Sequence, residues 1–116
     1  MSKKDKKVIW RKKVDILGQI YDVQYRNSCK RCDELKCDGF TSWDEKKIRV
    51  LNTYCPTYDR KNVRHEILHA FLFESGLHNN THVKPAEYIH DEQNVDWIAI
   101  HFPSMYKIFK ELDVLD

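Results

Sequence analysis

The sequence predicts an α+β fold in which a small antiparallel sheet from the N-terminal half packs on helices from the C-terminal half. Short apolar segments separated by turn residues fill the first half of the chain. In the second half, apolar residues recur at helical spacing. The 116 residues are enough for one hydrophobic core but few for two, and so a single domain over residues 14–116 is expected.

Two hairpins are expected in the first half. Residues 14–25 carry apolar side chains on both sides of Gly18, and this glycine with Gln19 predicts a turn. Residues 38–52 predict the second hairpin, whose second strand is expected to be an edge that binds an extended peptide. The charged segment between the hairpins, residues 27–38, predicts a loop that holds three of the four cysteines.

Three helices are expected in the second half. The first takes Thr57 or Asp59 as its N-cap and stops at Gly76. The second covers residues 86–102 and is ended by Pro103, because proline has no N–H to continue the helical hydrogen bonds. A short last helix follows that proline.

Basic residues concentrate at the N-terminus. Residues 1–13 hold six lysines and one arginine against one aspartate, whereas the whole chain has a net charge of only +2. A flexible, solvated arm is the simpler interpretation, and contact of this arm with nucleic acid is the alternative. No apolar run approaches the roughly 20 residues that span a bilayer, and no secretory signal is recognisable. A cytoplasmic protein without a membrane partner is therefore expected.

The most informative stretch is "VRHEILHAFLFESG", residues 63–76. His65 and His69 are four residues apart, so on a helix their imidazoles lie on nearly one face and can bind one Zn²⁺. Glu66 follows the first ligand and is placed to take a proton from a metal-bound water. This helix is the most apolar of the chain, which argues against histidines that simply lie on its surface. The H-E-x-x-H pattern therefore predicts two zinc ligands and one catalytic base.

A catalytic zinc of this type needs a third protein ligand. The variant in which a histidine follows the motif is excluded, because the chain has Leu72 and Ser75 where that variant needs glycine and histidine. Glu92 lies on the polar side of the second helix and is the expected ligand. Asp96 follows one turn later, where it can accept an N–H from a ligand histidine and fix its orientation. His82 is the competing third ligand.

Peptide hydrolysis also needs a group that stabilises the developing oxyanion. Tyr54, His82 and Tyr88 are the candidates for this transition-state donor, and their spacing does not decide among them.

The four cysteines suggest a second site. Cys29 and Cys32 form a C-x-x-C knuckle, which with Cys37 and Cys55 has the composition of a four-thiolate zinc site. The second C-x-x-C that usually completes such a site is missing. The alternative is that these are reduced thiols, one or two of them packed in the core.

The stretches "HEILHAFLFESGL" and "DEQNVDWIAIHFPSM" together resemble the phage-associated zinc metallopeptidases of the ImmA/IrrE type. The resemblance covers residues 38–110. It implies a minimal gluzincin, a zincin-like fold in which a small sheet packs on the active-site helix. It also implies His65, His69 and Glu92 as ligands and Glu66 as the base. Members of this family act as intracellular peptidases, in some cases on phage-type repressors.

The leading interpretation is thus a zinc-dependent metallopeptidase, a hydrolase acting on a protein or peptide in the cytoplasm. One alternative is a non-catalytic zinc-binding module, against which Glu66 argues because a structural zinc site needs no base there. The other is an SprT-like, DNA-associated protease recruited by residues 1–13. A histidine in place of Glu92 as third ligand and salt-dependent DNA binding would distinguish that protease.

Overall fold

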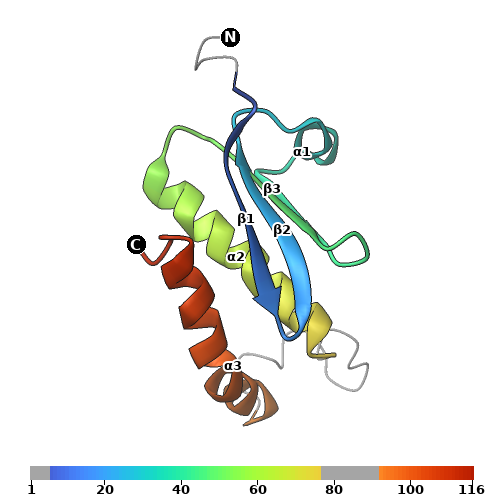
Figure 1. The fold of residues 1–116 in the computed structure, drawn as a ribbon, viewed down its shortest axis with the longest axis vertical. Coiled ribbons are helices and arrows are strands. Elements are labelled where there is room, and N and C mark those ends of the chain that lie inside the picture. Colours follow the sequence, from blue (N-terminus) through green and yellow to red (C-terminus); the bar gives the residue numbers. More distant parts are fainter. Residues whose placement is uncertain (1–5, 77–91) are drawn as a thin grey trace.

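The computed structural model describes residues 6–76 and 92–116, with only the backbone for residues 92–96 and 99 (Figure 1). It confirms the α+β class, with strands in the N-terminal half packed against helices. The elements in chain order are β1 Val8–Ile16, β2 Gln19–Arg26, α1 Lys30–Leu35, β3 Gly39–Ser42, β4 Lys47–Leu51, α2 Pro56–Glu74 and α3 Glu92–Glu111.

The four strands form one mixed sheet in the order β1-β2-β4-β3. Each expected hairpin is present as an antiparallel pair, β1 with β2 and β3 with β4. The expectation of an antiparallel sheet is nevertheless wrong, because β4 lies parallel to β2 with Asp22 opposite Lys47 and Arg26 opposite Leu51. Parallel pairing requires the chain to return from the end of β2 to the end of the sheet at which β2 begins. The segment between β2 and β4 is long enough for this. The strand at 47–52 is therefore interior, and β3 is an edge.

The first hairpin is longer than expected. Its turn residues are Leu17 and Gly18, with φ of 53° and 91°, and the Asp15 carboxylate accepts a hydrogen bond from the Gly18 N–H at 2.7 Å. β1 begins at Val8, and so residues 8–13 belong to the sheet and not to a flexible arm. The reason is Trp10, which is partly buried with its ring centroid 6.0 Å from that of Tyr25.

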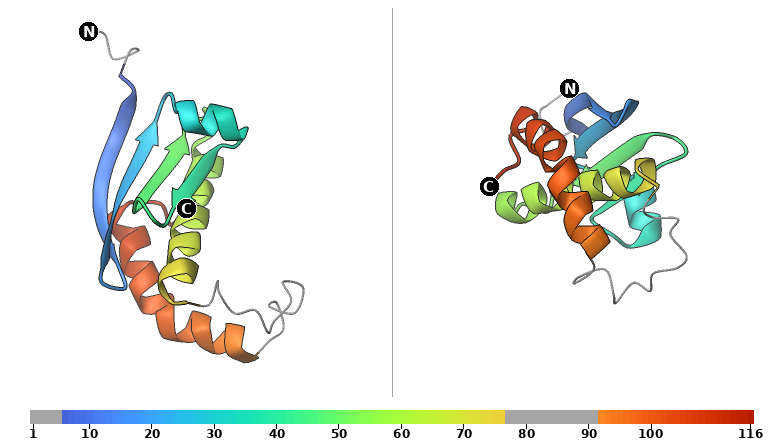
Figure 2. Two further views of the ribbon diagram at one scale, coloured as in Figure 1. Left: turned by 90° about the vertical axis from the view of Figure 1, so that its right-hand side faces the viewer. Right: turned by 90° about the horizontal axis from the view of Figure 1, so that it is seen from below.

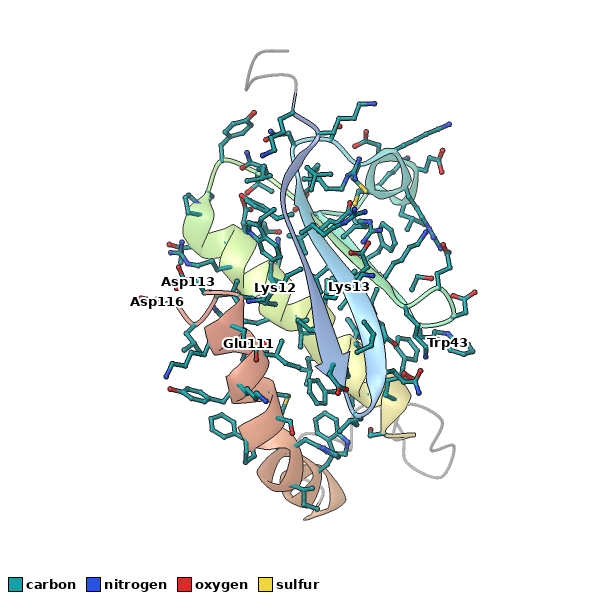
Figure 3. The ribbon with its side chains drawn as sticks, in the orientation of Figure 1. Lys12, Lys13, Trp43, Glu111, Asp113 and Asp116 are labelled. Carbon is teal, nitrogen blue, oxygen red and sulfur yellow. The ribbon has the colours of Figure 1, made fainter. Side chains whose placement is uncertain are left out.

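Neighbouring lysines of β1 lie on opposite sides of the strand (Figure 3). The Lys12 ammonium donates to the main-chain oxygen of Glu111 at 3.1 Å, which places this side chain on the side of α3. Lys13 pairs across the sheet with Asp22 and lies over β2. The alternation of a strand thus carries part of the basic N-terminal segment onto the sheet face that α3 does not cover.

The segment expected to be a loop contains a short helix, α1. Cys29 is its N-cap, with its sulfur accepting a hydrogen bond from the Cys32 N–H at 3.2 Å. Lys36, in the left-handed conformation with φ of 55°, ends it. A helix of six mostly charged residues has no apolar repeat from which it could have been predicted.

α2 begins earlier than expected. Pro56 occupies its first turn, where the missing N–H costs nothing, and Cys55 is the N-cap. Asp59 is instead buried inside the helix, and its carboxylate accepts hydrogen bonds from the Thr53 N–H at 3.0 Å and from the Tyr25 hydroxyl at 2.5 Å. Burial and this hydrogen bond raise the pKa of Tyr25, so its hydroxyl stays protonated and ties α2 to the sheet. At the other end, Gly76 follows the helix with a φ of 81°, which agrees with the predicted stop.

α3 is continuous through Pro103, so the prediction that this proline ends the helix is wrong. The helix changes direction along its length (Figure 2), as expected where proline removes one helical hydrogen bond. Packing on both sides of the proline compensates for the loss: Trp97 before it and Met105 and Ile108 after it are buried. The predicted helical residues 86–91 lie outside the described residues.

Both long helices cover the same face of the sheet (Figure 2). The core between them is formed by side chains from β1, β2, β4, α2 and α3, and the largest of those that are fully buried are Tyr21, Phe71, Ile16, Ile48 and Ile67. Of the described elements, α1 lies at one end of the other face. No helix in the described part of the chain is long and apolar enough to cross a membrane.

Candidate metal centre

His65 and His69 lie side by side on α2, as the spacing predicts. Their Nε2 atoms are 3.1 Å apart and their ring centroids 4.7 Å. Two ligand nitrogens at 2.0–2.1 Å from a shared Zn²⁺ would be this far apart at an N–Zn–N angle of roughly 100°, close to tetrahedral. Without a metal, the same distance suits a hydrogen bond between the two rings. The pair therefore fits zinc in donor type and in separation.

Both imidazoles are exposed to solvent, contrary to the expectation from the sequence. The expectation that this helix is the most apolar of the chain is also wrong, because α3 is richer in apolar residues than α2. The histidines are exposed because the core contacts of α2 are made by other positions of the helix, among them Val63, Ile67 and Ala70. Because a helix has 3.6 residues per turn, the histidines lie on the helix surface next to these core-facing positions. An exposed pair of this kind is accessible to a metal ion and to a substrate.

Glu66 lies next to this pair but faces the sheet. Its side chain is buried, and the Thr41 hydroxyl of β3 donates to it, with Thr41 Oγ1 2.8 Å from both Oε1 and the main-chain oxygen of Glu66. Gly39 allows the close approach, since a Cβ there would lie 3.5 Å from Glu66 Oε2 and 3.1 Å from the Arg49 carbonyl oxygen. The helix thus holds the Glu66 carboxylate against the edge strand β3.

The sequence did not predict that Thr41 and Gly39 belong to the site. The sequence pattern that could have indicated them is their spacing. They are two residues apart in strand β3 and so point to the same face, and both are small. Only the pairing of β3 with α2 shows that this face meets Glu66.

The first part of α3 is attached to the end of α2. The Trp97 indole N–H donates to the Ser75 hydroxyl at 2.8 Å, and the His101 ring lies between Trp97 and Phe71, with centroid distances of 5.0 and 6.2 Å. His101 is partly buried. The helix that begins at Glu92 is therefore docked beside the helix of the H-E-x-x-H motif.

The third ligand stays a prediction. The side chains of Glu92 and Asp96 lie outside the described residues, as do His82 and Tyr88. Among the residues that are described, no three His, Cys, Asp or Glu side chains converge as they would around a metal ion. Tyr54, the other suggested oxyanion donor, lies before the first turn of α2, at 84% exposure, and so is remote from the histidines in the middle of that helix.

The end of α2 is fixed against the second hairpin. Both carboxylate oxygens of Glu74 accept from the Lys46 ammonium at 2.8 Å, and the Tyr21 hydroxyl lies 3.5 Å from one of them. Burial, and then the neighbouring Glu74, raise the pKa of Tyr21. Trp43 stacks on Phe73 with centroids 6.1 Å apart and remains half exposed at the tip of this hairpin (Figure 3).

Three of the cysteines lie on or next to α1, and the fourth precedes α2. Cys29 and Cys32 are buried, Cys37 is half-buried, and Cys55 is exposed at the start of α2. Burial, together with the Cys29 sulfur, raises the pKa of the Cys32 thiol, which therefore stays protonated rather than presenting a thiolate. Cys29 and Cys32 are thus packed in the interior, and a zinc site shared by the four cysteines stays a prediction.

The chain's relationships to other proteins were tested by comparing it with models of protein families, with curated proteins and with solved structures. None of these comparisons found a match.

Proposed function

We propose that the protein is a zinc-dependent metallopeptidase that hydrolyses peptide bonds of a cytoplasmic protein substrate. The observation that carries the proposal is the geometry on α2. Two exposed imidazoles present nitrogens 3.1 Å apart, and a buried carboxylate held by Thr41 lies between them in sequence and against the edge strand. A pair of surface histidines alone would not call for a carboxylate buried at that position.

The residues divide the work as follows. His65, His69 and Glu92 hold the ion, and Asp96 orients one of the histidines. Bound there, Zn²⁺ polarises the scissile carbonyl and makes a water molecule more acidic. Glu66 takes the proton of the attacking water and gives it to the leaving amine. His82 or Tyr88 donates a hydrogen bond to the developing oxyanion.

Thr41 is a positioning residue in this scheme. Its hydroxyl holds one oxygen of Glu66, and so limits the rotation of the carboxylate about its side-chain bonds. The other oxygen remains available for proton transfer.

The substrate is proposed to bind as an added strand. β3 is an edge of the sheet and lies against α2 at Glu66, so a peptide paired with it would pass close to the histidines. The exposed Trp43 ring beyond the end of β3 offers an apolar contact for a side chain of that peptide. A phage-type repressor is the substrate class that the ImmA/IrrE resemblance suggests.

Removal of the metal tests the proposal. The purified protein, loaded with zinc, should cleave members of a mixed peptide library detected by mass spectrometry. A chelator should abolish the cleavage, and added zinc should restore it. His65→Ala should show no cleavage with or without zinc, whereas Lys61→Ala, an exposed change one turn earlier on α2, should cleave as the parent protein does. Cleavage that survives chelation would contradict the proposal, and zinc binding without any cleavage would favour the non-catalytic module.

A further inference from the structure

The sheet face opposite α2 and α3 carries a basic hollow of about 200 Å³ between α1 and strands β2, β3 and β4. Five of the residues that line it are cationic and one, Glu45, is acidic. The cationic residues are Arg26, Lys30, Arg31, Lys47 and Arg49.

Strand alternation builds this hollow. Ile48 and Val50 point into the core, and so Lys47 and Arg49 point to the other face of β4. The same rule applies to Arg26 of β2, and α1 then brings Lys30 and Arg31 over this end of the sheet. The hollow therefore does not share a face with His65 and Glu66.

The positive charge of the hollow is only partly neutralised. Glu45 is shared by Arg31 at 2.6 Å and Lys47 at 3.4 Å. Asp22 is shared in the same way by Arg11 at 3.3 Å and Arg49 at 3.1 Å. Each carboxylate thus faces two cations, which leaves an excess of positive charge that an anionic ligand would offset.

Two further cations, Arg26 and Lys30, have no acidic partner among the residues that the structure describes. Arg26 donates to the Gln24 side-chain oxygen at 2.6 Å and to the Ser28 carbonyl at 2.8 Å, both neutral acceptors. No ion pair of Arg26 or Lys30 occurs within residues 6–76 and 92–116. Burial lowers the pKa of the neighbouring Arg49, which shows the cost of keeping that guanidinium charged here.

Lys6 and Lys7 of the basic N-terminal segment lie near the hollow. The Asn27 main-chain N–H donates to the Lys7 carbonyl at 2.7 Å, and the Asn27 side chain donates to the Lys6 carbonyl at 2.8 Å. Asn27 follows Arg26 directly, and both lysines are exposed. Lys6 and Lys7 therefore add positive charge next to the hollow.

The hollow also offers a surface for stacking. The Arg31 guanidinium lies over the Phe40 ring, 4.8 Å from its centroid, and both residues line the hollow. Unpaired bases stack on aromatic rings and on guanidinium planes, whereas phosphate makes no stacking contact. Charge and stacking together are the combination by which proteins bind single strands.

We propose that this hollow binds a single strand of nucleic acid. Lys30, Lys47 and Arg26 contact its phosphates, and an unpaired base stacks on Arg31 and Phe40. This activity goes beyond peptide hydrolysis and is separate from it, because the two surfaces belong to opposite faces of the sheet.

Fluorescence anisotropy tests the proposal with the full chain and a labelled oligothymidylate of roughly 16 nucleotides. Contact with three or four phosphates predicts that log K falls against log salt with a slope between about −2 and −3. Lys30→Glu/Lys47→Glu should weaken binding at least about tenfold at roughly 50 mM salt. The matched control, Lys107→Glu/Lys110→Glu, makes the same change of net charge on exposed positions of α3 and should change binding less than about twofold.

Two milder variants keep the test independent of folding. Lys30→Gln changes one exposed side chain and should make the salt slope shallower by about 0.7, the share of one phosphate. Phe40→Leu should weaken binding of the oligonucleotide about fivefold or more but leave binding of inorganic polyphosphate unchanged. Equal losses in the hollow and control pairs, no binding by the parent protein, or no effect of Phe40→Leu on the oligonucleotide would each overturn the proposal.

Discussion

Glu66→Gln should lower kcat for peptide hydrolysis by about 10²- to 10⁴-fold while leaving the zinc content unchanged. The amide has almost the shape of the carboxylate, and its oxygen can still accept from the Thr41 hydroxyl, which lies 2.8 Å from Glu66 Oε1. It cannot take a proton from the attacking water. Steady-state kinetics on a peptide identified in the library digest, together with metal analysis of the same samples, measure both parts of the expectation.

The matched control is Glu111→Gln, the same chemical change at an exposed position near the end of α3. It should leave kcat within about twofold of the parent value, because rates respond only to groups that act in the transition state. If Glu66→Gln were as active as Glu111→Gln, Glu66 would not be the base. If Glu66→Gln lost its zinc, the carboxylate would have a role in binding instead.

Phe71→Ala should lower the free energy of unfolding by about 3–5 kcal/mol. Phe71 is fully buried in the core between the sheet and the two long helices, and its ring lies 6.2 Å from that of His101 on α3. Truncation to alanine removes the apolar surface and leaves a cavity where α2 meets α3. A domain of this size has about 5–15 kcal/mol of stability in all, so the variant should be near the limit of folding at 37 °C. Urea unfolding followed by circular dichroism gives the value.

Leu68→Ala on the same helix is the control for Phe71→Ala. Leu68 is 38% exposed, so its truncation should cost about 1 kcal/mol or less. Equal costs for the two variants would mean that Phe71 is not at the centre of the core, and the packing of α3 on α2 would have to be revised.

Local rules predicted the elements that depend on neighbouring residues. The spacing of His65 and His69 fixes their shared face through the helical period alone, and the observed 3.1 Å between their nitrogens follows from it. Gly18 predicted the first turn to within one residue, because a left-handed conformation favours glycine there. Gly76 predicted the end of α2 for the same reason.

Features that depend on distant contacts could not be predicted in this way. The parallel pairing of β2 with β4 leaves no trace in either strand, because both strands alternate as an antiparallel pair would. From its neighbours in the sequence, Pro103 is expected to end the helix. The helix nevertheless continues, because Trp97 before the proline and Met105 after it are buried in the core. Asp59 reads as an N-cap, yet its partners are Tyr25 and Thr53. In each case tertiary packing decides against the local preference.

The candidate site also combines residues that the sequence predicts with residues that only the fold brings together. The motif residues on α2 were recognisable from the sequence, since their chemistry is set by type and spacing. Thr41 and Gly39 were not, because nothing near them in the chain indicates that β3 lies against Glu66. The cysteines suggested a common site through their number and type, and only the fold shows that Cys29 and Cys32 are buried whereas Cys55 is the exposed N-cap of α2.

The most direct test of the central claim is the zinc content of protein purified without added metal or affinity-tag nickel, for the parent chain and for Glu92→Ala. One zinc per chain, largely lost in Glu92→Ala, is the expected result, because two imidazoles alone bind zinc far more weakly than a complete set of three ligands. A zinc that survives Glu92→Ala and is lost in Cys32→Ser would place the metal at the cysteines. A parent chain that binds no zinc, even after reconstitution, would contradict the peptidase assignment.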